Sequence, residues 1–234
     1  MPHFLITRLT SSFTHYKSTQ TPLGSLQQPR HNAFLFSFNS FTSGRDNHKG
    51  VTFTVSYLIK SCGLSPELAY KLSNGVSLKT PDGPNAVLDT LKDYGFSKTE
   101  VAKLVEKHPS VLAANAEKTI LPKVQFFHSI GVSNTDMPKI ILKNPFILRR
   151  SLAKCLVPRC RIIRSVVHDD QEVVRVLRKS PFAFTYADMM NDLVPNIEVL
   201  RQSGVPQGPI SLLMVNFPGV AYGKHSRFVE AVKR

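Results

Sequence analysis

A proline returns along this chain at a nearly constant interval, and each time it opens a similar apolar phrase. Four such prolines stand 36, 36 and 37 residues apart: Pro109, Pro145, Pro181 and Pro218. Three more keep the same period, thirteen or fourteen residues after the first three: Pro122, Pro158 and Pro195. Self-similarity at a fixed period of this length is typical of a stacked-repeat architecture.

The residues before each proline show helical periodicity. In the first repeat Val101, Leu104 and Val105 lie at i, i+3 and i+4, which places them on one helical face. The same three columns recur in the later repeats: Met137, Ile140, Ile141; Val173, Val176, Leu177; Ile210, Leu213, Met214. The residue before a proline is driven out of the α region, and proline has no N–H for the next backbone bond. We therefore expect four helix boundaries: His108, Asn144, Ser180 and Phe217.

A second helix is predicted after each proline phrase. Its apolar columns are Ile120, Leu156 and Leu193; Val124, Cys160 and Ile197; Phe127, Ile163 and Leu200. Gly131 and Gly204 follow this pattern and suit a left-handed C-cap, where glycine avoids a Cβ penalty.

Helix starts are also indicated. Ser97 with Glu100, and Asp169 with Glu172, have the spacing of capping boxes or close variants of them. Gly208-Pro209 predicts a third start, with proline in the first helical position.

A unit of two helices joined at a proline, each with one apolar stripe, must stack on its neighbours to bury those stripes. The sequence therefore predicts an all-α fold, a right- or left-handed superhelical solenoid of helix-proline-helix repeats of about 36 residues.

The repeats resemble those of the mitochondrial transcription termination factor (mTERF) family, in which a K-x-P phrase is followed by a second proline step. The matching runs are KHPSVL at 107–112 with Leu121-Pro122, and KNPFIL at 143–148 with Val157-Pro158. The resemblance covers about residues 50–234, and residues 53–69 are similar to the first segment of plant members. It implies an organellar nucleic-acid-binding protein that regulates or terminates transcription.

The chain departs from the family repeat at several positions. Val167 stands where a glycine is expected, Asn216 replaces the lysine two residues before Pro218, and Gly219-Val220-Ala221 replaces the usual bulky pair. The array also stops inside its final unit at Arg234, so we expect a C-terminally truncated member, from a gene model or a splice form.

Three regions are predicted. Residues 1–45 have no acidic residue, are rich in Ser and Thr and contain Arg8, Lys17, Arg30 and Arg45, which is typical of a disordered organellar transit peptide. Residues 46–94 form a helical lead-in segment with a degenerate repeat, and residues 95–234 form the repeat array, its last repeat incomplete. The resemblance to plant members favours the mitochondrion, with the chloroplast as the alternative. No apolar run is long enough to span a membrane, and no membrane partner is expected.

The formal net charge of +14 is concentrated in one repeat. Residues 131–167 hold eight basic residues against the single acid Asp136. Such a surface attracts phosphates by releasing counterions and carries no sequence information. The predicted nucleic-acid-binding residues are Lys143, Arg149, Arg150, Lys154, Arg159, Arg161, Arg164, Arg175, Arg178 and Lys179. Lys143 and Lys179, with Lys107, could instead complement helix dipoles.

Double-stranded DNA is the predicted partner, and structured RNA, in intron splicing or ribosome assembly, is the alternative. A third hypothesis is a protein-interaction scaffold that binds a partner helix in an apolar groove. RNA readers stack unpaired bases on exposed aromatic side chains. All five aromatic candidates fall in apolar columns, so we expect them in the core: Phe126, Phe127, Phe146, Phe182 and Phe184.

Nothing in the sequence indicates catalysis, a cofactor or a metal site. Cys62, Cys155 and Cys160 lack the spacing of zinc ligands, and Cys160 falls on an apolar stripe. Cys155 and Cys160 point in different directions on one predicted helix, which argues against a disulfide. Asp169-Asp170 suits a helix N-terminus better than acid-base chemistry. The sequence assigns no oligomeric state.

Overall fold

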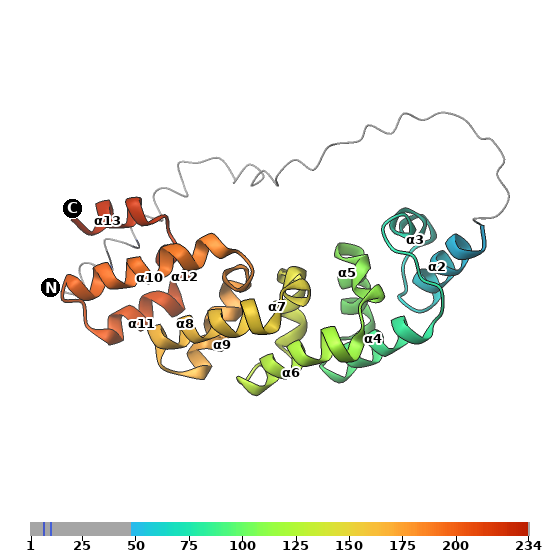
Figure 1. Cartoon of the computed structure of the whole chain (residues 1–234), viewed down its shortest axis with the longest axis horizontal. Helices are drawn as coiled ribbons and strands as arrows, with labels where there is room; N and C mark the ends of the chain where they lie inside the picture. The colour runs from blue at the N-terminus through green and yellow to red at the C-terminus, as the bar shows by residue number, and fades with distance from the viewer. Residues whose placement is uncertain (1–6, 8–9, 11–47, 234) are drawn as a thin grey trace, which may run out of the picture.

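The computed structural model describes Thr7, Thr10 and residues 48–233. The predicted transit peptide at residues 1–45 lies outside the described residues except for these two threonines. Residues 48–233 form helices that follow one another along an arc, with α4 and α6 on its outer edge and α5 and α7 nearer its inner edge (Figure 1). The described part of the chain contains no strand, and the predicted all-α repeat fold is confirmed.

The helices fall into a lead-in group and successive repeats. The lead-in helices are α2 (His48–Lys60), α3 (Pro66–Ser73) and α4 (Asp82–Asp93). The first helices of the repeats are α5 (Lys98–Lys107), α7 (Met137–Lys143), α9 (Asp170–Lys179) and α11 (Gln207–Asn216). The second helices are α6 (Leu121–Ser129), α8 (Val157–Val167) and α10 (Ala187–Gln202), and α13 (His225–Lys233) comes last.

Each first helix ends where the sequence predicts. The C-caps of α5, α7, α9 and α11 share one conformation, with φ between −151° and −130° and ψ between 53° and 82°: His108, Asn144, Ser180 and Phe217. The proline that follows then opens a tight turn. These proline turns are the 3-10 helices η1 (Pro109–Ala113), η3 (Pro145–Arg149) and η5 (Pro181–Phe184), and the short α12 (Pro218–Ala221).

The second proline of each repeat is accommodated in two ways. Ahead of α6 and α8 lie the π-helical segments η2 (Ala116–Ile120) and η4 (Leu152–Leu156). In η2 the Leu121 N–H donates to the Ala116 carbonyl five residues back, and in η4 Val157 does the same to Leu152. This wider turn fits a following proline, which has no N–H and whose ring would collide with the carbonyl four residues earlier. In the third repeat Pro195 lies inside α10.

The predicted glycine caps are confirmed at Gly131 and Gly204, with φ of 96° and 73°. After α6 the Gly131 N–H donates to the His128 carbonyl (2.9 Å) and Val132 N–H to the Phe127 carbonyl (3.0 Å), which together form a Schellman motif. The repeat that lacks glycine places His168 in the left-handed region, at φ 63°. It is the one described non-glycine residue with positive φ. It directly follows Val167, which stands where a glycine is expected.

One of the three predicted helix starts needs correction. At α5 the capping box is complete, because Ser97 Oγ accepts from Glu100 N–H (3.3 Å) and Glu100 Oε2 accepts from Ser97 N–H (2.9 Å). At α9 Asp169 is the N-cap and accepts from the Gln171 N–H (2.9 Å), and because Glu172 pairs with Arg175 this start is a variant of the capping box. At α11 the helix begins at Gln207, so proline is not its first residue.

The apolar columns form one continuous core along the array. All twelve residues predicted for the first helices are buried, as are those of the second helices. Cys160 is buried as predicted, and burial raises the pKa of its thiol. Burial likewise raises the pKa of Cys62 to about 11, and all three cysteines are free thiols.

Gly95 is the glycine at which two neighbouring units approach most closely. Its φ is 94°, and a Cβ there would lie 2.7 Å from the carbonyl carbon of Asn134 and still closer to its oxygen. Gly204 has a similar φ of 73° and open space around its Cα.

We expect Gly204→Ala to lower the free energy of unfolding by about 1–2 kcal/mol, the cost of a left-handed alanine. Gly95→Ala should cost roughly 1–3 kcal/mol more, because the Asn134 backbone must also move. Urea unfolding followed by circular dichroism measures both. Equal losses in the two variants would contradict the close approach at Gly95.

Candidate nucleic-acid interface

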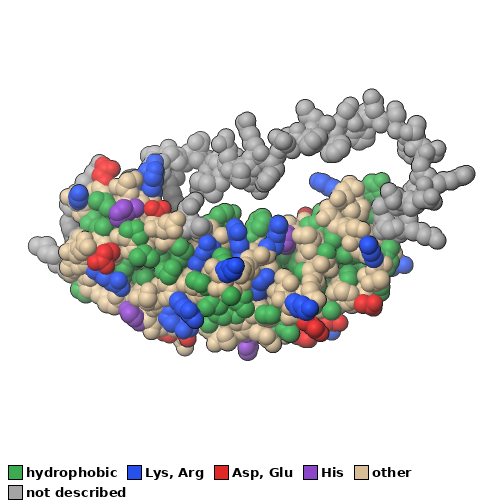
Figure 2. Space-filling view, viewed as in Figure 1, with side chains coloured by type: hydrophobic (Ala, Val, Ile, Leu, Met, Phe, Trp, Pro, Cys, Tyr) green, Lys and Arg blue, Asp and Glu red, His purple; other side chains and the backbone are tan. Residues whose placement is uncertain are grey.

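The ten predicted cations occupy three consecutive parts of the array. Lys143 ends α7, Arg149 ends η3, Arg150 follows it and Lys154 lies in η4; Arg159, Arg161 and Arg164 lie on α8, and Arg175, Arg178 and Lys179 on α9. In the second repeat the proline turn and the π-helical segment expose Arg149, Arg150 and Lys154 between the buried residues Leu148 and Leu156. Figure 2 shows Lys and Arg side chains gathered around α5 and α7 on the inner side of the arc, and a separate group near α8 and α9 on its outer side.

Lys143 and Lys179 bridge neighbouring repeats. Lys143 Nζ donates to the carbonyl of Lys179 (2.6 Å), at the end of the next first helix. Lys107 reaches the Leu142 carbonyl (3.0 Å) in the same way, and Lys179 reaches Asn216 Oδ1 (3.3 Å). The dipole that each lysine complements is therefore that of the following repeat. Asn216 stands where the three earlier repeats have a lysine, and its side-chain oxygen accepts the hydrogen bond from Lys179.

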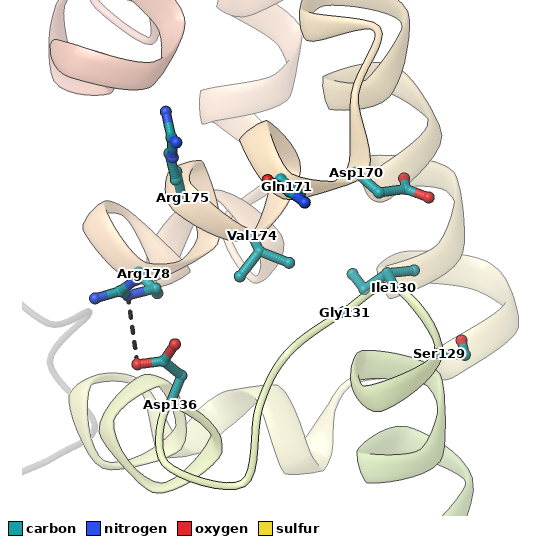
Figure 3. A pocket seen from close by; sticks show the side chains of 9 residues that line it. All are labelled: Ser129, Ile130, Gly131, Asp136, Asp170, Gln171, Val174, Arg175 and Arg178. Atoms are coloured by element: carbon teal, nitrogen blue, oxygen red, sulfur yellow. Dashed lines mark ion pairs between the residues drawn. The ribbon is translucent and has the colours of Figure 1, made fainter.

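Three arginines are paired with acids. Arg164 pairs with Asp170, Arg175 with Glu172 at 2.9 Å and Arg178 with Asp136 at 3.5 Å. A cavity of about 500 Å³ lies between the Gly131 loop and α9. Figure 3 shows that Arg178 turns toward Asp136 there, whereas Arg175 extends away from Asp136. These guanidinium groups are neutralised in part within the protein, which reduces the field they offer to a phosphate.

Arg159 occupies an inward-facing position just after the second proline. The equivalent residues donate to the next proline turn: Lys123 Nζ to the Leu148 carbonyl, and Asn196 Nδ2 to the Ala221 carbonyl (3.0 Å). Burial lowers the pKa of Lys123. Arg159 is half-buried, and one of its terminal nitrogens is buried with no hydrogen-bond partner. This position serves the contact between repeats.

Four of the ten cations are exposed and form neither an ion pair nor a side-chain hydrogen bond with the described residues: Arg149, Arg150, Lys154 and Arg161. The Arg149 guanidinium lies 5.9 Å from the centre of the Phe146 ring. His108 is close by, and burial together with the charge of Arg149 lowers the pKa of its imidazole. We call these four residues the open cation cluster. They are the predicted residues with the most charge to offer a polyanion.

The prediction that all five phenylalanines lie in the core is wrong for two of them. Phe127 and Phe184 are fully buried and Phe126 is partly buried, but Phe146 and Phe182 are 45% and 37% exposed. In a proline turn the second and third residues after proline face the core, and the first faces outward. The signal was available in the sequence, because Ser110 and Gly219 occupy the same column as these two phenylalanines.

The remaining surface offers small grooves between proline turns. One of about 210 Å³ lies between η1 and η3, beside His108 and Arg149, and one of about 200 Å³ lies between the lead-in segment and η1. Within residues 48–233 no cluster of His, Cys, Asp or Glu is suited to holding a metal ion. The described helices include none with the length and apolar character needed to cross a membrane.

A one-dimensional array of proline-broken helices with an exposed cationic repeat defines the class of helical-repeat nucleic-acid-binding proteins. The family model for mTERF matches residues 88–232, and the chain belongs to the mTERF family. Members of this family are organellar proteins that bind nucleic acids and regulate transcription. No curated protein matches the chain.

The geometry separates lysines that hold the array from lysines free to bind phosphate, and Lys143 and Lys154 form a matched pair. Lys143→Met should lower the free energy of unfolding by about 1 kcal/mol, because it leaves helix-end carbonyls without their donor. Lys154→Met should change it by less than about 0.5 kcal/mol. In nucleic-acid titrations the effects of the two variants should be reversed. Lys154→Met should reduce the slope of log K against log salt by about one, and Lys143→Met should leave it unchanged. Identical behaviour of the two variants would contradict the distinction.

Proposed function

We propose that the protein binds double-stranded DNA in an organelle and acts in the regulation or termination of transcription there. The observation that supports this most directly is the open cation cluster of Arg149, Arg150, Lys154 and Arg161. These side chains project from one repeat, have no acidic partner among the described residues and lie in a segment with a single acid. Contacts of this kind fix a protein on the phosphate backbone and release counterions.

We further propose the organisation expected from the sequence, with a transit peptide at residues 1–45, a helical lead-in segment at 46–94 and the repeat array at 95–234. The similarity of residues 53–69 to plant members supports assignment to the plant branch and to the mitochondrion, with the chloroplast as the alternative compartment. We propose that the ten predicted cations contribute unequally to the interface, with Lys143 and Lys179 contributing least because they donate to helix-end carbonyls of the next repeat. The open cation cluster is the part we expect to contribute most.

RNA binding is the second candidate, and the exposure of Phe146 and Phe182 favours it. A salt titration of the full chain against a labelled duplex DNA and a structured RNA of equal length distinguishes the two. Tighter binding to the duplex with a steep salt slope would support the DNA function. Preference for RNA would support splicing or ribosome assembly, and no salt-dependent binding to either would overturn both and favour a protein-interaction scaffold.

Reversing three charges of the cluster should weaken binding to every nucleic-acid sequence by a similar factor. For Arg149→Glu, Arg150→Glu and Arg161→Glu combined, we expect the slope of log K against log salt to flatten by up to about three, since each lost phosphate contact removes about 0.9. The matched control is Lys60→Glu, Lys71→Glu and Lys92→Glu, an equal charge change at exposed lead-in residues. An unchanged slope in the first variant, or equal flattening in both, would exclude the cluster as the phosphate contact.

A further inference from the structure

Aromatic side chains stand exposed at the proline turns, where the fold does not require them. Phe146 and Phe182 are 36 residues apart in sequence and each directly follows its proline. Packing gives no reason for an aromatic residue there, because Ser110 and Gly219 fill the same position in the other two turns. An exposed aromatic ring at the same position of two neighbouring repeats is a candidate contact for a partner that lies along the array.

Each phenylalanine has a ring neighbour. The rings of Phe146 and His108 are 6.1 Å apart, and the Arg149 guanidinium lies over Phe146. The rings of Phe182 and Tyr186 are 6.0 Å apart with 33° between their planes, and Tyr186 is itself 49% exposed. The exposed Phe146 ring therefore stands beside the buried ring of His108, and the exposed Phe182 ring stands beside a second exposed ring, that of Tyr186.

The turn that carries Phe182 is firmly positioned. Buried Asn144 of the preceding repeat donates to the Pro181 carbonyl (3.1 Å) and to Thr185 Oγ1 (2.8 Å), on either side of Phe182. Thr185 in turn donates to the Phe182 carbonyl (3.1 Å). A platform that is fixed before its ligand arrives loses little conformational entropy on binding.

We propose that Phe146, Phe182 and Tyr186, here called the aromatic row, stack on unpaired nucleobases of a single-stranded nucleic acid whose phosphates are held by Arg149 and Arg150. The bases of an intact duplex cover one another's faces and offer only their edges in the grooves, so a duplex alone gives these rings nothing to stack on. Alternating aromatic and cationic contacts are the usual means of holding single strands. The cationic surroundings favour a nucleic acid over an apolar peptide. This inference rests on the proposed nucleic-acid binding.

The test compares ligands that share phosphates but differ in bases. The full chain is titrated, by fluorescence anisotropy at fixed salt, against a labelled single-stranded RNA, the same DNA strand, an abasic DNA strand of equal length and the matching DNA duplex. We expect Phe146→Ala and Phe182→Ala each to raise the dissociation constant for the two base-containing strands roughly tenfold. Binding to the abasic strand and to the duplex should stay the same.

Two controls keep the result interpretable. Tyr70→Ala removes an aromatic ring that is 65% exposed on α3 of the lead-in group and belongs to no proline turn, and it should change no dissociation constant. Phe146→Leu and Phe182→Leu keep an apolar side chain at the turn while removing the aromatic face, and should behave as the alanine variants do.

The outcomes separate the two proposals. A tenfold loss confined to base-containing strands supports the aromatic row, and the relative affinities of the RNA and DNA strands then identify the ligand. If the wild-type chain binds duplex and abasic strand but the aromatic variants bind every ligand as it does, the aromatic row is excluded and nucleic-acid binding stands. If the wild-type chain binds none of the four ligands, both proposals fail.

Discussion

The array depends on how the carbonyl groups left open at each proline are satisfied. A helix that stops at a proline leaves its last carbonyls without intrahelical donors, and the proline itself has no N–H to offer. Here the preceding repeat supplies the donor to a backbone carbonyl: Lys107 for Leu142, Lys143 for Lys179, and Lys179 for Asn216. The interruption that defines each repeat thus also provides the contact that orders it against its neighbour.

A second row of contacts works on the same principle further along the unit. Lys123 and Asn196, each directly after the second proline, donate to carbonyls of the following proline turn. Buried Asn144 adds two bonds between the second and third repeats. Because an unmade buried hydrogen bond costs more than a made one contributes, these donors fix the register of stacking more than they add to its strength. Hydrophobic burial along the core provides the bulk of the stability.

The sequence predicts the repeat, its helix ends and its glycine caps, because each follows from local chemistry around a proline or a glycine. His108 and Asn144, for example, end their helices because the next residue is a proline. The target of Lys143 does not follow in this way, since the acceptor lies 36 residues away and depends on how the repeats stack. The outward direction of Phe146 does not follow from its own apolar character, because a 3-10 turn does not keep the α-helical period, and only Ser110 and Gly219 in the same column indicate it.

The same limit applies to the predicted interface. Composition identifies the second repeat as cationic, but it does not tell which cations the fold uses for itself. Arg164 and Arg178 pair with Asp170 and Asp136, acids that come close only through folding. Counting charge along the sequence therefore overstates the field available to a ligand, and the open cation cluster is what remains after the internal pairs are set aside.

The proline turn connects stability with function in this chain. Each turn, 3-10 in the first three repeats and α-helical in the fourth, directs two residues inward to the core and one outward, so the outward residue can change without loss of packing. That freedom is used differently in each repeat: serine at 110, phenylalanine at 146 and 182, and glycine at 219. A ligand lying along the turns would meet a different side chain at each step while the scaffold beneath stayed the same. Stacking on such rings tolerates any base, so discrimination between sequences must come from contacts to base edges.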